Sequence, residues 1–287
     1  MNVDLTQAIF HDEEAARAHF ETVRWPNGPF CPHCGSVNFV RMAGDKHRAG
    51  LLNCRDCDKQ YSATVGTVFE ASHLPLHKWL LVNHLMNASK KGVSAKQVER
   101  MLGITYKSAW FMCHRIRAAM TDPNPAPVGG TGKVVEADEA YHGKRETPRS
   151  PSAQRGDRPY VHRGREGGQQ KRPILALVER GGQVRTKHVN HVNGANVRDF
   201  VVRNADRKSR LHTDESRLYP SVGSEFAKHE TVNHGDHEYA RDDVTTNTIE
   251  GFFGVFKRGM VGVYQHCGEQ HFQRYLDEFA FRYNNRS

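Results

Sequence analysis

Residues 245–266 read TTNTIEGFFGVFKRGMVGVYQH, and this stretch sets the organisation of the chain. Its apolar residues recur at helical spacing and predict an amphipathic helix that Thr248 or Thr246 would cap. Two glycines would then end the helix: Gly259 and Gly262. Glu250 precedes Lys257 by nearly two helical turns, so the two side chains would share a face. A lone acid on such a helix has chemical meaning only if other carboxylates converge on it.

Predicted strands elsewhere in the chain supply partner carboxylates. Residues 133–143 alternate so that Glu136 and Asp138 lie on one face of a strand. Residues 174–179 and 184–189 form a hairpin, a helix follows, and a fourth strand at 211–214 ends in Asp214. This order is that of the ribonuclease H-like fold, a mixed five-stranded α/β sheet whose first and fourth strands lie side by side. Asp138, Asp214 and Glu250 occupy the places where that fold gathers carboxylates.

Three acids from separate elements suit divalent cations that prefer oxygen ligands, namely Mg²⁺ or Mn²⁺. Two such ions can activate the attacking oxygen and stabilise the leaving oxygen at a phosphodiester. By position alone, other acids are competitors for the same site: Glu136, Glu139, Glu215, Asp242 and Asp243. Three histidines can also reach it, but Mg²⁺ favours oxygen, so we expect surface or supporting roles for His212, His234 and His237.

Four of the six cysteines have metal-ligand spacing. Two Cys-X-X-Cys pairs, each able to form a knuckle that directs both thiolates at one ion, stand nineteen residues apart: Cys31, Cys34, Cys54 and Cys57. Four thiolates predict a tetrahedral, structural Zn²⁺ site in a zinc ribbon over residues 26–70, preceded by a helix within residues 1–25. Basic residues in the ribbon make DNA contact one option, and contact with another protein is the alternative.

Residues 74–121 predict a three-helix domain. Ser94 would cap the second helix with Gln97 in a capping box, Gly103 would make a turn, and Thr105 would cap the third helix. A helix, a short glycine turn and a helix are typical of a helix-turn-helix, although an ordinary helical hairpin has the same pattern. In the DNA-binding version the second helix of the pair enters the major groove by its N-terminal residues.

That placement selects candidate DNA contacts at the start of the third helix: Thr105, Tyr106, Lys107 and Ser108. Arg115 and Arg117 would lie further along, near phosphates. Lys and Arg outnumber Asp and Glu by 41 to 32, a formal net charge of +9 over 287 residues, which favours a polyanionic partner as well as plain solubility. No apolar run is long enough to span a bilayer and the N-terminus lacks a signal-peptide pattern, so we expect no membrane partner and a cytoplasmic location.

Two segments are rich in residues that disfavour regular structure. Residues 122–132 carry Pro and Gly and predict a linker before a catalytic domain at 133–287. Residues 144–172 carry many Arg, Lys, Gly and Pro and predict a basic insertion, either a solvated loop or an arm that contacts phosphates.

From the cysteine motifs to the last helix, the chain resembles bacterial insertion-sequence transposases of the DDE class. It is most similar to the group that joins a zinc ribbon and a helix-turn-helix to a ribonuclease H-like core. The motifs that carry the resemblance are CPHC, CRDC, VEADEAYHG, HTDESRLYP and NTIEGFFGVFKRGMVGVYQHCGEQHFQRYLDEFAFRYNNR. One departure is Thr245, where many relatives carry His.

The resemblance implies Asp138, Asp214 and Glu250 as the catalytic acids that bind Mg²⁺, with Lys257 as the basic residue that follows them. Some relatives use Asn as the third member, so Asn247 is the alternative to Glu250. Lys257 and Arg258 would lie near DNA phosphates. We prefer Glu250 because a carboxylate binds the metal better than an amide and because the step to Lys257 fits.

The implied function is an Mg²⁺-dependent DNA transposase, bacterial and nucleoid-associated. It would bind the terminal inverted repeats of double-stranded element DNA, cleave the ends and join their 3′-OH groups to target DNA. Bringing two ends together implies a homodimer or a larger synaptic assembly. Relatives usually run on past the final Tyr-Asn, so one alternative is a DNA-binding regulator on an inactive or truncated core. The other alternative is a metal-dependent nuclease without strand transfer.

Overall fold

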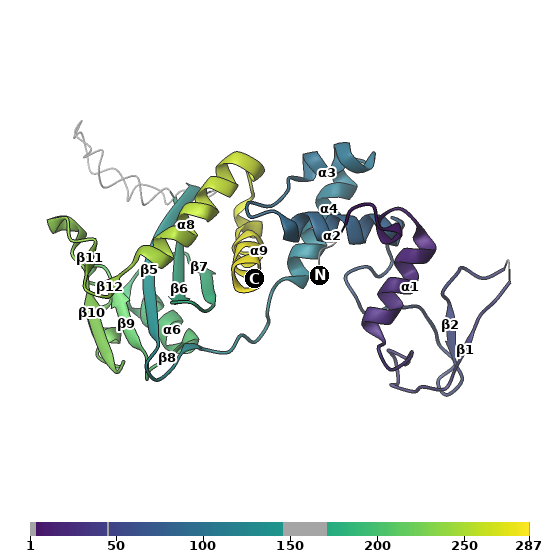
Figure 1. Ribbon diagram of the computed structural model, residues 1–287, viewed down its shortest axis with the longest axis horizontal. Coiled ribbons are helices and arrows are strands. Elements are labelled where there is room, and N and C mark those ends of the chain that lie inside the picture. Colours follow the sequence, from purple (N-terminus) through teal and green to yellow (C-terminus); the bar gives the residue numbers. More distant parts are fainter. Residues whose placement is uncertain (1–3, 45, 146–170, 287) are drawn as a thin grey trace, which may run out of the picture. The chain divides into compact units, whose positions relative to one another are not determined.

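The computed structural model describes residues 4–44, 46–145 and 171–286 (Figure 1). It divides into two compact units, Met1–Ala119 and Met120–Ser287, each of which is considered by itself. In the part of the chain that is described, no helix combines the length and the apolar character that a membrane span requires. The greater part of the predicted basic insertion, residues 146–170, lies outside the described residues.

The N-terminal unit opens with helix η1 (Ala8–Phe10) and helix α1 (Glu13–Arg24), which Asp12 caps by accepting from Ala15 N–H at 2.7 Å. A small antiparallel sheet follows, made of β1 (Phe39–Arg41), β2 (Leu52–Cys54) and β3 (Gln60–Tyr61). Buried Trp25, Leu52 and Tyr61 form its core.

The four predicted zinc ligands converge beside this sheet. Their sulfur atoms all lie within 4.8 Å of one another. Cys31 Sγ is 3.7 Å from Cys57 Sγ, and Cys34 Sγ is 3.6 Å from Cys54 Sγ. Four sulfurs held about 2.3 Å from one zinc ion at tetrahedral corners would lie about 3.8 Å apart, so the cluster fits the predicted ion.

The predicted three-helix pattern is confirmed by α2 (Leu76–Ala88), α3 (Ala95–Leu102) and α4 (Tyr106–Ala119). Ser94 caps α3, accepting from Gln97 N–H at 3.1 Å, and Thr105 Oγ1 accepts from Ser108 N–H at 3.2 Å. Gly103 turns the chain between α3 and α4 with φ 60°, a left-handed conformation that glycine adopts without steric cost. Proline precedes α2 and cannot cap it, so the carboxylate of Glu13 accepts from the Leu76 N–H at 2.9 Å instead.

The C-terminal unit is built on a five-stranded sheet in the order β10-β9-β5-β6-β7. Its strands are β5 (Val134–Lys144), β6 (Lys171–Glu179), β7 (Val184–His188), β9 (Arg210–Thr213) and β10 (Lys228–Thr231). β5, β6 and β7 are antiparallel, whereas β9 lies parallel to both β5 and β10. The prediction that the first and fourth strands lie side by side is therefore confirmed.

Helices cover both faces of this sheet (Figure 1). One face packs on α6 (Gly194–Asn204) and α7 (Pro220–Gly223) through Val135, Ala137 and Leu175. The other face packs on α8 (Asn247–Gly259) and α9 (Phe272–Asn284) through Ala140, Ile174 and Ala176. Alternate residues of β5 thus point to opposite layers, as the period of two predicts.

At three places this unit differs from what local sequence indicates. Residues 228–231 form the edge strand β10, the fifth strand of the sheet, because parallel pairing with β9 supplies partners that local sequence does not show. The predicted linker contains β4 (Val128–Gly129), which pairs with β8 (Ala205–Asp206). Gly262 does not end the long helix, because the chain continues as a π-helical turn, η3 (Met260–Tyr264), until Gln265 at φ 58°.

Removal of zinc should unfold the ribbon while leaving the C-terminal unit folded, because so small a sheet has too little core to fold without its ion. Purified protein should contain one zinc per chain by mass spectrometry. Chelation, or Cys57→Ser, should expose the peptide bonds after Arg55 and Lys59 to trypsin. The matched control is Cys113→Ala, a buried cysteine on α4. Full zinc content in Cys57→Ser would contradict the assignment.

Candidate active site

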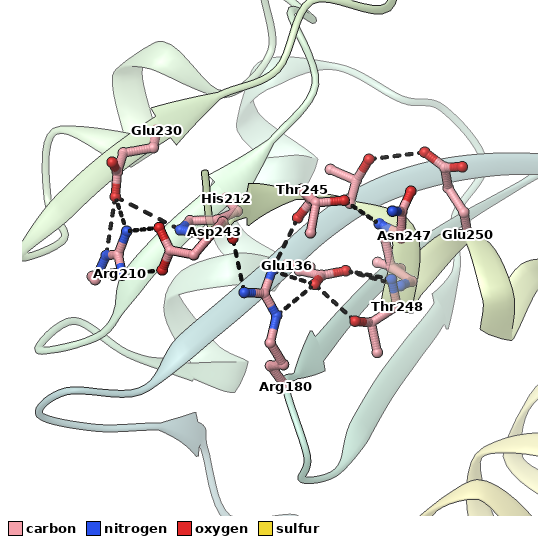
Figure 2. Close-up of polar contacts among 12 residues, drawn as sticks. Glu136, Arg180, Arg210, His212, Glu230, Asp243, Thr245, Asn247, Thr248 and Glu250 are labelled. Carbon is pink, nitrogen blue, oxygen red and sulfur yellow. Dashed lines mark hydrogen bonds and ion pairs between the residues drawn. The ribbon is translucent and has the colours of Figure 1, made fainter. Parts of the chain in front are cut away.

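Helix α8 is capped by a carboxylate from the sheet. Thr246 precedes the helix, but its side chain makes no capping hydrogen bond, so the expectation that Thr246 or Thr248 caps the helix was wrong. Glu136 Oε2 on β5 accepts from the backbone N–H groups of Thr248 at 2.9 Å and Ile249 at 3.0 Å. Glu136 Oε1 accepts from Thr248 Oγ1 at 2.8 Å (Figure 2). A negative charge at the N-terminus of a helix also interacts favourably with the helix dipole.

Arg180 completes the environment of this carboxylate (Figure 2). Its Nε and Nη2 donate to Glu136 Oε1 at 3.1 and 2.9 Å. Its Nη1 donates to the Asp243 carbonyl at 2.9 Å, which ties in the hairpin of β11 (Ala240–Arg241) and β12 (Val244–Thr245). The Glu136 side chain is 0% exposed, and both of its oxygens already accept hydrogen bonds. Its role is therefore structural: it fixes the start of α8 against the sheet.

Asp138 lies on the same face of β5 as Glu136, two residues further on. Glu136 is in register with His212 on the parallel strand β9. The same offset, 212 − 136 = 214 − 138 = 76, carries Asp138 to Asp214, which directly follows β9. Adjacent strands are about 4.8 Å apart, so the sheet places the first two predicted acids beside each other.

Burial and neighbouring charges both disfavour the ionised form of these acids. Together, burial first and then the charges of Glu139, Asp214 and Glu250, they raise the pKa of Asp138 to about 8. Burial also raises the pKa of Asp214. Carboxylates that favour their protonated form in this way gain from a bound cation, because its charge stabilises the ionised form.

Glu250 stands in the first turn of α8 and is 43% exposed. Thr246 Oγ1 donates to Glu250 Oε1 at 2.8 Å. His234 Nε2 lies 3.7 Å from the same oxygen. The charge of Glu250 is the last and smallest of the causes that raise the pKa of Asp138, so the two carboxylates are close enough to interact.

The three acids fit a divalent-metal site by the chemistry of their donors. All three offer carboxylate oxygens, the ligands that Mg²⁺ and Mn²⁺ prefer. Among the described residues, the four cysteines form the one group of three or more His, Cys, Asp or Glu whose ligand atoms all lie within 4.8 Å. The ligand oxygens of the three acids therefore do not all lie within that distance of one another in this structure.

Three of the competing acids have other partners, and a fourth is exposed in a turn. Glu139 Oε2 accepts from Tyr219 Oη at 2.6 Å on the opposite layer of the sheet. Glu215 accepts from the His234 N–H at 2.9 Å. Asp243 pairs with Arg210 at 2.6 Å, and the guanidinium lowers the pKa of Asp243 to about 2. Asp242 is exposed in the β11–β12 turn at φ 53°.

Lys257 and Arg258, near the end of α8, are both accessible to solvent. Lys257 is exposed, with Nζ 5.9 Å from the ring centroid of Phe253. Burial lowers the pKa of His142 on β5 most, and the charge of Lys257 is the next largest cause, so Lys257 lies close to this strand. Arg258 is also exposed. The alternative third member, Asn247, is exposed at the first position of α8, where its backbone N–H donates to Thr245 Oγ1 at 3.1 Å.

At the start of α4, Thr105, Tyr106 and Lys107 are exposed and Ser108 is half-buried. Arg115 is instead engaged within the N-terminal unit, since it donates to the carbonyls of Glu70 at 2.9 Å and Thr67 at 3.4 Å. The expectation that Arg117 lies near DNA phosphate was wrong, because its side chain packs inside the unit and is 2% exposed.

Sequence reasoning missed the roles of Arg180 and His234. Arg180 acts 44 residues from Glu136, and nothing in the local sequence marks that pairing. His234 was noted as a histidine able to reach the site, but only the structure places it beside Glu250. Its position in helix η2 (His234–Asp236), directly after the unpredicted strand β10, explains the omission.

Two family models match this chain. One described as "ISXO2-like transposase domain" matches residues 129–284, and one described as "Transposase zinc-ribbon domain" matches residues 11–60. A Halobacterium salinarum protein, described as an uncharacterized protein in transposable element ISH50, is 31% identical over 257 residues, which cover 87% of this chain and 83% of that protein.

Two solved structures show weaker similarity. The Mos1 transposase paired-end complex with left transposon end is 13% identical, with a TM-score of 0.31, over 72% of this chain and 74% of that chain. The simian T-cell lymphotropic virus intasome in complex with PP2A regulatory subunit B56 gamma is 12% identical, with a TM-score of 0.31, over 70% of this chain and 64% of that chain. This chain thus spans slightly less than two thirds of the intasome chain.

Glu136→Gln should lower the free energy of unfolding by about 2–4 kcal/mol, because it turns an amide N–H₂ toward buried donors and removes the charge that Arg180 pairs with. Urea denaturation followed by circular dichroism measures this. The matched control is Glu225→Gln, which alters a carboxylate paired with Arg198 at 2.6 Å on the surface and should cost less than about 1 kcal/mol. Equal losses for the two variants would contradict the capping role.

Proposed function

We propose that this chain, which belongs to the ISXO2-like transposase family, cleaves the ends of an insertion sequence and joins them to target DNA. The observation that supports this proposal is the parallel register of β5 and β9, which brings Asp138 level with Asp214, beside a helix that carries Glu250 in its first turn and is capped by the sheet. The four-cysteine ribbon and the three helices that follow it supply a separate unit for recognition.

Asp138 and Asp214 would hold divalent metal from the sheet, and Glu250 would complete the ligand set from α8. When bound, Mg²⁺ or Mn²⁺ would activate the attacking oxygen and neutralise charge on the leaving oxygen. In cleavage, the oxygen of water attacks phosphorus, the P–O3′ bond at the element end breaks, and a 3′-OH is left. In joining, that 3′-OH attacks a target phosphodiester, whose own P–O3′ bond breaks.

Lys257 and Arg258 would bind the DNA backbone beside the acids. Lys257 is seven residues after Glu250 on α8, which is nearly two turns, so the two side chains share a face. An exposed cation about 10 Å along the helix from a metal ligand can contact a phosphate next to the scissile one.

The start of α4 would read the element end. Its exposed N-terminal turn carries Tyr106 and Lys107, and the preceding Gly103 turn gives the connection typical of a helix-turn-helix. The Arg115 side chain links α4 to the backbone carbonyls of Glu70 and Thr67, so its contribution to DNA binding would be indirect. The formal net charge of +9 favours association with DNA in general.

Joining two element ends in one reaction would need at least two copies of the chain, so we expect a homodimer or a larger synaptic assembly on double-stranded DNA. An enzyme with this substrate would act in the cytoplasm, with the nucleoid DNA.

Glu250→Gln should abolish cleavage and joining of an element-end duplex in Mg²⁺, because the amide offers a weaker and neutral metal ligand, while binding to the duplex stays within about twofold of wild type. Asn247→Ala is the matched variant three residues upstream and should keep activity within about tenfold. The products would be resolved on denaturing gels, and binding would be measured by fluorescence anisotropy.

Each other outcome of this experiment has a defined meaning. Nicks without joined products in the wild type would favour a nuclease. Specific binding without cleavage in Mg²⁺ or Mn²⁺ would favour a regulator on an inactive core. Loss of cleavage in Asn247→Ala but not in Glu250→Gln would move the third position to Asn247.

Lys107→Ala should weaken binding to the element end several-fold and lower the slope of log affinity against log salt by about one, because one phosphate contact is lost. The control is Lys187→Ala, which removes a cation of β7 that lies 3.8 Å from Asp199 and should leave the affinity unchanged. Anisotropy titrations at several salt concentrations measure both quantities. Unchanged affinity and slope in Lys107→Ala would contradict the proposed reading helix.

A further inference from the structure

We infer that His234 is a positioning residue for the third acid and that it couples this acid to the segment that carries the second. The inference rests on the proposed function, because it assigns to Glu250 a metal-binding role that the side chain must be held in place to perform. The observations that carry it are the contacts of His234 with elements on both sides of the acid site.

On the Glu250 side, the imidazole and a threonine hydroxyl surround one carboxylate oxygen. His234 Nε2 lies 3.7 Å from Glu250 Oε1 and 3.4 Å from Thr246 Oγ1. Thr246 Oγ1 in turn donates to Glu250 Oε1 at 2.8 Å. The three groups form a compact triangle at the start of α8, in which the imidazole can donate to the acid after a small shift.

On the Asp214 side, the backbone of His234 is anchored to the residue that follows the second acid. The Glu215 carboxylate accepts from the His234 N–H at 2.9 Å and from the Gly235 N–H at 3.2 Å. Asn233 accepts from the same Gly235 N–H at 3.0 Å and holds the short turn η2 closed. The main chain at His234 is therefore tied to the β9 end, while its side chain points to α8.

The ring also has a neighbour within its own loop. The centroid of the Tyr239 ring lies 5.3 Å from that of His234, with a tilt of 56°. Tyr239 directly precedes β11, and its carbonyl accepts from Thr245 Oγ1 of β12 at 3.3 Å. An aromatic neighbour restricts the rotamers open to the imidazole, so the group that contacts Glu250 is itself held.

A positioning role follows from the exposure of the acid. The Glu250 side chain is 43% exposed and has three rotatable bonds, so holding it in a ligand geometry costs conformational entropy. A partner that restrains the carboxylate reduces that cost at the moment of metal binding. Groups that orient metal ligands in this way typically change metal affinity by about 10–100-fold when they are removed.

Mn²⁺ affinity of the full-length protein, measured by electron paramagnetic resonance of the free ion, tests the inference without using activity. His234→Ala should weaken Mn²⁺ binding about tenfold, and His234→Gln should recover most of the loss, because the amide Nε2 can donate from nearly the same position. The matched control is His237→Asn, in the same loop, at φ 60° where Asn is tolerated, and it should bind as wild type does.

The outcomes separate this inference from the proposed function. If Glu250→Gln binds Mn²⁺ as tightly as wild type, the proposed metal site fails. If Glu250→Gln weakens binding while His234→Ala and His237→Asn both match wild type, only the role of His234 is overturned. If thermal unfolding shows that His234→Ala is destabilised, His234→Gln decides: affinity near wild type supports positioning, and affinity as low as that of the Ala variant overturns it.

Discussion

The carboxylate of Glu136 is the interaction on which the active-site geometry depends. It receives the first free N–H groups of α8 and the guanidinium of Arg180 at once, so the sheet, the helix and the β11–β12 hairpin meet at one buried charge. Such a charge is stable only when every partner is present. The direction in which α8 leaves the sheet, and with it the place of Glu250, is therefore set by a residue two positions from Asp138.

Two acids on one face of β5 have different environments. Glu136 has cationic and N–H partners, whereas burial and neighbouring carboxylates raise the pKa of Asp138 to about 8. The contrast supports the proposed division of tasks on one strand face: Glu136 holds the helix, and Asp138 would bind the cation. His234 and Thr246 both lie beside one carboxylate oxygen of Glu250.

Regular spacing in the sequence predicted much of this structure. The period of two placed Glu136 and Asp138 on one face, and the Cys-X-X-Cys pairs identified the ribbon, since both patterns are local. The strand β10, the cap of α8 and the position of His234 were not predictable, because each depends on pairing between segments far apart in the chain. Thr246 and Thr248 resembled caps in sequence, but a carboxylate 112 residues upstream from Thr248 took that role.

The central claim is that Glu136 positions α8 so that Glu250 shares metal with Asp138 and Asp214. Anomalous diffraction from crystals soaked in Mn²⁺ tests it most directly. The account predicts Mn²⁺ peaks bounded by the carboxylates of Asp138, Asp214 and Glu250, with Glu136 still bonded to the Thr248 and Ile249 N–H groups. Mn²⁺ bound to Glu136, or a site completed by Asn247 with Glu250 turned to solvent, would contradict it.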